Sequence, residues 1–450
     1  MTTLKTRVCI IGAGAGGIGC AYGAVKNGID TVVVDRNPDF GGTMVFSGVD
    51  GWEPGVSLDG LHEELYRRMA EMEKGCHVVA QVPNDFLFDR RDATGWDGRY
   101  SFAAYPWALA FGSDYAYTDT FQRVPYRFSK RLQFEPSAMV RAVRDALAPY
   151  GEHLTALFGT VYESCTHRDG RITSVTVSRG EETWRIEADV FVDATGDILL
   201  ARDAGCAFSI GTEGAEDYHE PSAKEKSDVI NAVSYVFRIA KAEDPAHVDE
   251  IPPEYAALVD GGMMQRVKST VAYFVEYPNG DFNVNMLPTM SGREYLSLGE
   301  RADAVGHATV WAYWSYLQRE KGMQGYTLVQ IYGAGVRESY RLVGKYVLKE
   351  QDLRAGKPVA IKTERTIAIA DHALDVHGEG GMCKELERPY EIPIECTVAK
   401  EFDNLFVCCR GASFSHIAAS SARLSRTLLS MGEGVGEYLA EQFRASKGKP

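Results

Sequence analysis

Two histidines and two arginines in the second half of the chain are suited to proton transfer and anion binding. The ordinary pKa of a histidine lies near physiological pH, so His377 and His416 are candidates for a catalytic acid or base. Arg337 and Arg341 are one helical turn apart, and on one helix face they could clamp a carboxylate or a hydroxyl group. We expect all four residues to act at the substrate. The alternative for each is a structural role, in which other groups of the protein already bind its side chain.

A strand, a glycine turn and a helix at the N-terminus are the first elements that could position such a site. The apolar run 6–11 leads into Gly12-Ala-Gly14-Ala-Gly16-Gly17, and apolar residues at helical spacing follow in 18–25. A second apolar run at 31–34 ends in Asp35. This order and spacing are typical of a dinucleotide-binding βαβ unit.

Each residue of this motif has a physical role in holding a dinucleotide. Gly12 permits the tight turn, Gly14 lets a pyrophosphate approach the backbone, and Gly17 allows the helix to pack on the strand. The carboxylate of Asp35 can accept hydrogen bonds from the ribose hydroxyls. The motif alone does not separate FAD from NAD.

Three later segments favour FAD, because an extended FAD molecule needs support from distant parts of the chain. Arg36 is followed by Gly41-Gly42-Thr43, a second apolar strand ends in Asp193-Ala194-Thr195-Gly196-Asp197, and a strand, turn and helix span 404–436. A single-Rossmann NAD-dependent dehydrogenase, the second hypothesis, would have no reason for the last two segments. A non-catalytic flavin-binding protein is the third hypothesis.

Together these stretches resemble the FAD-dependent oxidoreductase family that has a glutathione-reductase-like FAD-binding domain, with a more distant relation to fumarate reductase-type flavoproteins. The resemblance extends to parts of 335–348, to Asp375-Val-His377 and to 392–436. It implies FAD as the cofactor and an organic small molecule as the substrate, with a hydride transferred between that substrate and the flavin N5. It also implies that the turn at 410–413 lies beside the flavin, which makes His416 the preferred acid or base.

The motifs and the resemblance give one set of expected cofactor contacts. These are Gly12, Gly14, Gly16, Gly17, Asp35, Arg36, Gly41, Gly42, Thr43, Val161, Ala194, Thr195, Gly196, Asp197, Gly411, Ser413, Ser420, Ser421 and Arg423. The chain departs from many relatives at Arg410, where an acid is common after the last strand. It also has one dinucleotide motif and not two, so we expect electrons to enter from the organic substrate and not directly from NADPH.

The predicted fold class is α/β: a Rossmann-like, glutathione-reductase-type FAD domain with an inserted α+β substrate domain. We expect the FAD domain to comprise residues 1–60, 130–210 and 389–450, and the substrate or cap domain to comprise 61–129 and 211–388. Strands are predicted at 161–165, 172–177, 183–186 and 189–192, and helices at 139–147, 295–320, 337–353 and 417–439. The aromatic run 100–128 is expected to fill a core or a dimer surface, or else to cap the substrate pocket.

Composition and charge exclude several other classes of protein. No apolar stretch approaches the length of a membrane span, and the net charge of −14 disfavours nucleic acid as a partner. The absence of a signal-peptide pattern leads us to expect a cytoplasmic protein. The sequence is compatible with a homo-oligomer. The nine cysteines include no C-x-x-C pair, so no metal site is expected, and the adjacent Cys408 and Cys409 are predicted to pack in the core.

Overall fold

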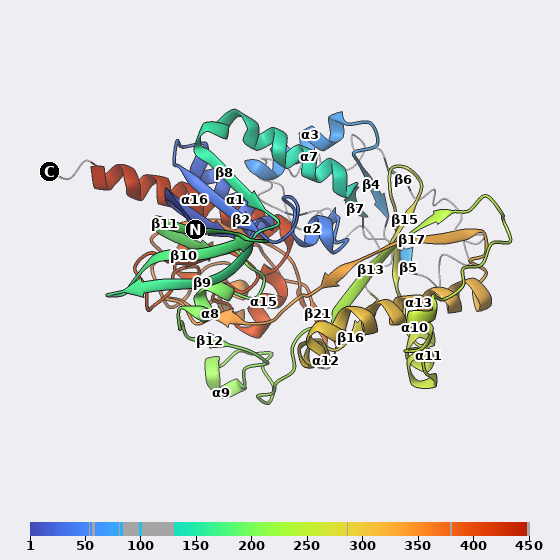
Figure 1. Ribbon diagram of the computed structural model, residues 1–450. Helices are drawn as coiled ribbons and strands as arrows, with labels where there is room; N and C mark the ends of the chain where they lie inside the picture. Colours follow the sequence, from blue (N-terminus) through green and yellow to red (C-terminus); the bar gives the residue numbers. More distant parts are fainter. Residues whose placement is uncertain are drawn as a thin grey trace.

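The first lobe of the molecule is built on a mainly parallel sheet (Figure 1). The computed structural model describes residues 1–53, 55, 59–80, 82–83, 99–100, 130–285, 287–378 and 380–447. In the sheet, β8 (Leu154–Phe158), β2 (Thr31–Asp35), β1 (Thr2–Ile11) and β11 (Glu182–Asp193) lie in that order and run parallel, and β23 (Leu405–Val407) pairs with the end of β11. The carboxyl ends of these strands therefore meet at one edge, where ligands bind in such sheets. The predicted α/β class is confirmed.

The strands predicted at 161–165, 172–177 and 183–186 are confirmed. β9 (Val161–Arg168) and β10 (Arg171–Arg179) are antiparallel to each other, and β10 is antiparallel to the first half of β11. Asp169 and Gly170 form the turn with positive φ. The two strands predicted at 183–186 and 189–192 are one continuous strand, because β11 leaves β10 and continues beside β1 and β23.

Two helices, α1 (Ala15–Val25) and α16 (Ser425–Lys447), pack against each other through glycines. A Cβ atom at Gly19 would collide with the backbone of Leu429, and one at Gly436 would collide with the backbone of Cys20 and Ala24. A Cβ at Gly432 would likewise meet the backbone of Gly16. Residue numbers rise together along the contact, so the two helices are parallel, and the first turns of α16 extend beyond the start of α1.

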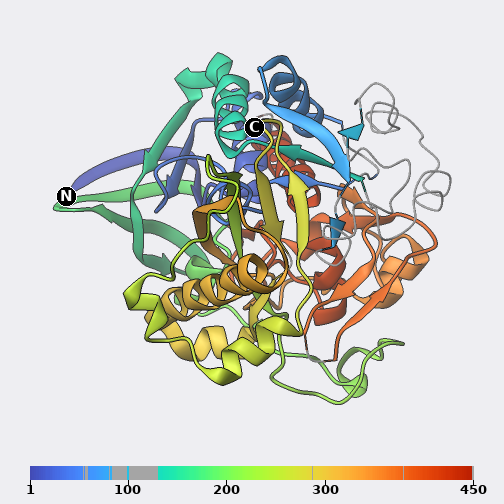
Figure 2. The same cartoon turned by 90° about the vertical axis from the view of Figure 1, so that its right-hand side faces the viewer.

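The second lobe contains a six-stranded sheet and a group of helices. β13 (Val233–Lys241) pairs antiparallel with β15 (Phe282–Asn285), β16 (Pro288–Met290) and β17 (Tyr326–Gly335), and β14 (Tyr273–Glu276) joins β15 to β5 (Val82–Pro83). Figure 2 shows the long helix α13 (Ala302–Glu320) lying across this sheet. The side chains of Phe237, Tyr313 and Trp314 are buried between them.

The remaining elements connect and flank the two lobes. β3 (Gly51–Trp52), β7 (Lys130–Phe134), β4 (Cys76–Ala80) and β6 (Arg99–Tyr100) form a four-stranded sheet. Short paired strands are β12 (Phe208–Ser209) with β18 (Arg341–Leu342), β19 (Thr366–Ala370) with β22 (Tyr390–Pro393), and β20 (Leu374–Val376) with β21 (Met382–Lys384). The other helices are α2 (Thr43–Phe46), α3 (Leu61–Glu71), α7 (Pro136–Leu147), α8 (Leu199–Asp203), α9 (Ala215–Tyr218), α10 (Pro253–Ala256), α11 (Gly261–Lys268), α12 (Gly292–Leu298), α14 (Glu350–Ala355) and α15 (His416–Ala422).

The helix predicted at 337–353 is wrong. Only Glu350–Ala355 is helical there, and Arg341–Leu342 is a short strand paired with Phe208–Ser209. Buried ion pairs made by Glu338 and Arg341 hold this segment against other elements, and such tertiary contacts override helix propensity. The predicted helix at 417–439 is present as α15 and α16, separated at residues 423–424. The aromatic run 101–128 lies outside the described residues, and the division into domains stays a prediction.

Candidate functional site

The glycine turn has one accessible point. Gly14 is the only residue between Val8 and Ala21 that is not buried. A Cβ at Gly12, whose φ is +107°, would lie 2.5 Å from the carbonyl oxygen of Ala194, and one at Gly17 would collide with the carbonyl of Gly12. At Gly14, by contrast, the nearest atom that a Cβ would meet is the Cα of Gly42 at 3.9 Å. Protein packing therefore explains Gly12 and Gly17, whereas Gly14 faces open space.

Asp35 holds the glycine turn through its carboxylate. Oδ2 accepts a hydrogen bond from the backbone N–H of Ala13 at 2.5 Å, and Oδ1 accepts from the backbone and side chain of Asn37 at 2.7 and 2.9 Å. A carboxylate offers about four acceptor positions, so one remains for a ligand hydroxyl. Arg36 is exposed beside it.

A second turn follows β11 at the same edge of the sheet. Asp193 is fully buried, and it accepts hydrogen bonds from the backbone and hydroxyl of Thr195 at 3.0 and 2.6 Å and from the backbone of Ala201 at 2.9 Å. Burial raises the pKa of Asp193 to about 6, although these hydrogen bonds oppose that shift. The turn leaves Thr195, Gly196 and Asp197 partly exposed.

Arg410 lies directly against this second turn. It is the only residue from 404 to 422 that is not buried, and its Nη2 donates to Oδ1 of Asp197 at 3.0 Å. A Cβ at Gly196 would collide with the guanidinium group. The Nε atom of Arg410 is buried and has no hydrogen-bond partner among the described residues. An acceptor supplied by a ligand would therefore be stabilising at this position.

The accessible residues of these segments form a rim along the carboxyl edge of the sheet. The rim, as we use the word, consists of Gly14, Gly42, Thr43, Thr195, Gly196, Asp197, Arg410 and Arg423. All but Arg410 were expected from the sequence as cofactor contacts. Gly16, Gly17, Gly41, Ala194 and Gly411 are buried just behind the rim, where they pack against backbone or core.

Three serines expected at the cofactor have other partners. The Ser413 hydroxyl accepts from the backbone of Gly344 at 2.9 Å, Ser420 donates to the carbonyl of Ile417 at 2.7 Å, and Ser421 bonds Tyr390 at 2.8 Å. All three serines are fully buried, so their side chains support the fold and do not reach the rim. Val161 also lies off the rim, on β9, with an exposed side chain.

His416 belongs to a buried network of charges. Its Nδ1 is 2.9 Å from Oε1 of Glu338, and that carboxylate also pairs with Arg341. Arg341 is fully buried and donates to Glu213 at 2.6 Å. Arg341 and His416, which is hydrogen-bonded to Glu338, hold the pKa of Glu338 at about 2 in spite of its burial. Two carboxylates therefore hold the buried Arg341. Residues 337–341 are not helical, so Arg337 and Arg341 do not share a helix face as predicted.

His377 forms a second histidine–carboxylate pair. Its Nε2 is 2.6 Å from Oδ2 of Asp375, and its side chain is 23% exposed, against 5% for His416. Burial lowers the pKa of His377, and the neighbouring Arg337 and Arg423 act in the same direction, whereas the hydrogen bond to Asp375 opposes this shift. Nδ1 is the ring nitrogen that Asp375 does not engage.

Asn231 joins the two pairs. Its backbone and side-chain nitrogens donate to Oε2 of Glu338 at 3.1 and 2.7 Å, while its Oδ1 accepts from the backbone of His377 at 2.7 Å. The next residue, Ala232, bonds the carbonyl of His377 through its N–H and the Nη1 atom of Arg337 through its carbonyl. Asn231 could not be identified from the sequence, because a lone asparagine before a strand is common. Its role arises only when the distant segments meet.

Asp50 lies between the four-stranded sheet and the six-stranded sheet, and it bonds residues of both. It is fully buried and accepts hydrogen bonds from Gln133 at 2.6 Å, from Asn283 at 2.8 Å and from the hydroxyl of Tyr277. Burial raises its pKa to about 7, which the hydrogen bonds and nearby Arg131 oppose. Sequence analysis missed this buried acid, since nothing in its neighbourhood marks it.

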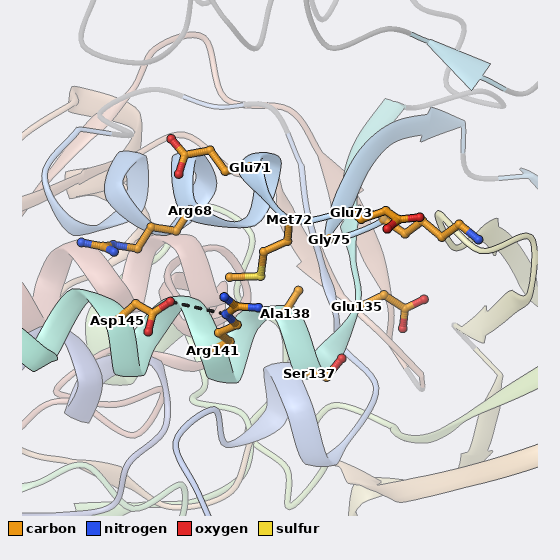
Figure 3. A pocket seen from close by; sticks show the side chains of 11 residues that line it. Arg68, Glu71, Met72, Glu73, Gly75, Glu135, Ser137, Ala138, Arg141 and Asp145 are labelled. Carbon is orange, nitrogen blue, oxygen red and sulfur yellow. Dashed lines mark ion pairs between the residues drawn. The ribbon is translucent and has the colours of Figure 1, made fainter.

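The surface pocket in Figure 3 does not belong to these residues. It has a volume of about 670 Å³ and lies between α3 and α7, where Arg141 and Asp145 form an ion pair. Its lining is mostly charged and includes no residue of the rim or of the two histidine pairs. Within the described part of the chain, no cluster of side chains is arranged to bind a metal ion, and no helix is long and apolar enough to cross a bilayer.

Comparisons with known proteins give the chain a family. AegA of Escherichia coli (strain K12) is 35% identical over 94 residues, which are 21% of this chain and 14% of AegA. The glutamate synthase (NADPH) small chain of Halomonas elongata is 31% identical over 94 residues, 21% of this chain and 20% of that protein. The matches thus span a fifth or less of these relatives.

A solved structure with a similar outline is that of a geranylgeranyl bacteriochlorophyll reductase-like protein from Thermoplasma acidophilum. It is 11% identical, with 100% of this chain and 81% of that chain covered and a TM-score of 0.45. The expected relation to fumarate reductase-type flavoproteins stays a prediction. A family model described as FAD dependent oxidoreductase matches residues 7–447, which is nearly the whole chain. The protein therefore belongs to the FAD dependent oxidoreductase family and is an enzyme that uses FAD.

Proposed function

We propose that FAD lies along the rim, with its pyrophosphate at Gly14 and its flavin toward Arg410 and Arg423. Two observations support this fit. Gly14 is the accessible residue of the turn, with open space where a side chain would be, and the Nε atoms of Arg410 and Arg423 are buried donors with no acceptor among the described residues. The parallel helices α1 and α16 add their positive N-terminal ends at this edge, which favours an anionic cofactor.

The proposed reaction is hydride transfer between an organic small molecule and FAD. The chemistry that bound FAD supplies is two-electron transfer as a hydride at the flavin N5. The protein must then hold the substrate and accept the proton that its O–H or N–H group loses. The single observation that carries this proposal is the His377–Asp375 pair, which is partly accessible and joined by Asn231 to a second histidine pair.

We assign proton transfer to His377 and a positioning role to His416. Asp375 binds Nε2 of His377 and so orients the ring, which leaves Nδ1 as the acceptor for a substrate proton. His416 is nearly inaccessible, and its bond to Glu338 fixes the start of α15. The sequence favoured His416 as the acid or base because it lies near the turn. We now favour His377, because its side chain is the more accessible of the two.

The experiment is anaerobic reduction of the purified, FAD-loaded enzyme by a panel of metabolites, followed by the loss of flavin absorbance at about 450 nm. The expected donor bleaches the wild-type enzyme, and His377→Asn slows that step about 10²- to 10⁴-fold at unchanged FAD content. NADH and NADPH alone are expected to bleach it slowly. If every donor in the panel fails while dithionite reduces the flavin, or if His377→Asn reacts at the wild-type rate, the proposal is wrong.

A further inference from the structure

Two acidic residues flank the glycine turn, one beyond each strand that neighbours β1. β2 and β11 lie on either side of β1, and Asp35 ends β2 whereas Asp197 follows the end of β11. Adjacent strands are about 4.8 Å apart, so Asp35, Gly14 and Asp197 follow one another along the carboxyl edge of the sheet. FAD has a matching order of groups, because its pyrophosphate joins the hydroxyls of the ribose to those of the ribityl chain.

The protein binds one of the two carboxylate oxygens of Asp197. Oδ1 accepts hydrogen bonds from the hydroxyl of Ser339 at 2.6 Å and from Nη2 of Arg410 at 3.0 Å. Within the described part of the chain no donor bonds Oδ2, and the side chain is 50% exposed in spite of its two partners. A carboxylate offers about four acceptor positions, so Oδ2 can accept hydrogen bonds from the hydroxyls of a ligand.

Arg410 makes this acid compatible with an anionic cofactor. Its guanidinium group lies against Gly196 and pairs with Asp197, which partly neutralises the carboxylate beside the proposed path of the pyrophosphate. The second lobe approaches the same point through Tyr295 of α12. Burial raises the pKa of Tyr295, the charge of Asp197 raises it further, and that of Arg410 opposes the shift. Asp197 therefore lies where both lobes adjoin the rim.

The backbone directly after Asp197 is strained. Ile198 has φ +46° and ψ +51°, in the left-handed region that β-branched residues rarely adopt. Its side chain is fully buried, and a Cβ on Gly411 would lie 2.6 Å from its Cγ2, so close packing holds this conformation. Strained backbone of this kind is concentrated at ligand-binding sites. The strain therefore marks the turn that carries the exposed Asp197.

We propose that Oδ2 of Asp197 binds the hydroxyl groups of the ribityl chain of FAD, and that Ser339 positions this carboxylate through Oδ1. This inference rests on the proposed placement of FAD and adds the residue that recognises its flavin half. Asp35 and Asp197 then bind hydroxyls on the two sides of the pyrophosphate. Ser339 also follows Glu338 directly, so the ribityl contact lies one residue away from the His416 network.

The test compares FAD with a synthetic analogue in which a pentyl chain without hydroxyls replaces the ribityl chain. Binding to the apoprotein is followed by flavin fluorescence. The wild type should bind the analogue about 10- to 100-fold more weakly than FAD, the loss expected for one or two hydrogen bonds to a charged group. In Asp197→Ala the ratio of the two Kd values should fall to about 1, and in Ser339→Ala it should be intermediate. The matched control Asp35→Ala should weaken both ligands equally and keep the wild-type ratio.

Each other outcome identifies which idea has failed. If the wild type binds both ligands equally, or if Asp197→Ala keeps the wild-type ratio, Asp197 does not bind the ribityl chain. If Asp197→Ala folds, by thermal unfolding, but binds neither ligand, Ser339→Ala decides, and a wild-type ratio there overturns the inference. If the ratio collapses in Asp35→Ala instead, FAD lies in the opposite direction and its proposed placement fails as well. If the ratios are as expected but no donor ever reduces the flavin, the ribityl contact stands and the proposed reaction fails.

Discussion

The side-chain oxygen of Asn231 accepts a hydrogen bond from the backbone N–H of His377 at 2.7 Å. Because the amide nitrogen of Asn231 also donates to Glu338, one side chain fixes the distance between the two histidine–carboxylate pairs. The asparagine can do this because its amide is a donor on one side and an acceptor on the other.

We predict that Asn231→Ala lowers the rate of flavin reduction by one to two orders of magnitude without loss of FAD, since His377 and Glu338 would lose their common support. Asn231→Asp should also lower the free energy of unfolding, because it buries a second carboxylate beside Glu338. Stopped-flow bleaching and urea unfolding measure the two effects. A wild-type rate for Asn231→Ala would show that the link between the pairs has no catalytic importance.

Gly14 and Gly17 should respond differently to a side chain. Gly14→Val is expected to fold and to lose FAD, because the added atoms occupy open space that the protein itself does not use. Gly17→Val should destabilise the protein, because its Cβ collides with the carbonyl of Gly12. Thermal unfolding and the ratio of absorbance at 450 to 280 nm separate the two effects. A Gly14→Val protein with stoichiometric FAD would refute the placement of the pyrophosphate.

Replacing Asp35 by alanine should weaken FAD binding by about 1 to 3 kcal/mol, the range for hydrogen bonds to a charged group. Part of that loss is indirect, because the same carboxylate holds Ala13 in the glycine turn. Asp35→Asn keeps an acceptor for one of these bonds and should lose less. Equilibrium binding of FAD to the apoprotein gives the affinities. Equal affinities for the wild type, Asp35→Ala and Asp35→Asn would mean that another group holds the ribose.

The two histidines should separate chemistry from stability. His377→Asn is expected to lower the reduction rate and leave the stability near that of the wild type, since its side chain is partly exposed. His416→Asn should lower the free energy of unfolding by several kcal/mol, because it removes a partner from a buried charge network. Bleaching rates per bound flavin, measured beside urea unfolding, test both. The assignment fails if the rate loss is found only in His416→Asn.

Asp50 should make stability depend on pH in an unusual direction. Its pKa is raised by burial from 3.8 to about 7, so the folded protein retains a proton that the unfolded chain has released between these values. The stability contribution of Asp50 is therefore full at acidic pH and decreases as pH rises toward 7. Between pH 5 and 8 the wild type should lose about 2 to 3 kcal/mol relative to Asp50→Asn. Urea unfolding at both pH values checks this, and parallel changes in the two proteins would contradict it.

The cofactor edge of the fold was predictable because its signals are local. The glycine turn, the acid after β2 and the glycine after β11 lie within short segments whose spacing alone specifies their geometry. The charge networks were not predictable. Arg341 lies between Glu213 and Glu338, and the first of these is far away in sequence, so nothing near residue 341 indicates that its guanidinium is already engaged. The same holds for Ser413 and Ser421, whose partners come from β-strand segments and loops that only tertiary folding brings close.

The glycine contact between α1 and α16 also sets an order of events during synthesis. The helix that must lie against the nucleotide turn is synthesised about 400 residues after it. Until α16 has been synthesised, the surface of α1 around Gly19 and Gly23 has no helix packed on it. Arg410 and Arg423 are also missing from the rim until late in synthesis. Nascent chains should therefore remain without cofactor, and FAD should be captured only once α16 has been translated and has docked.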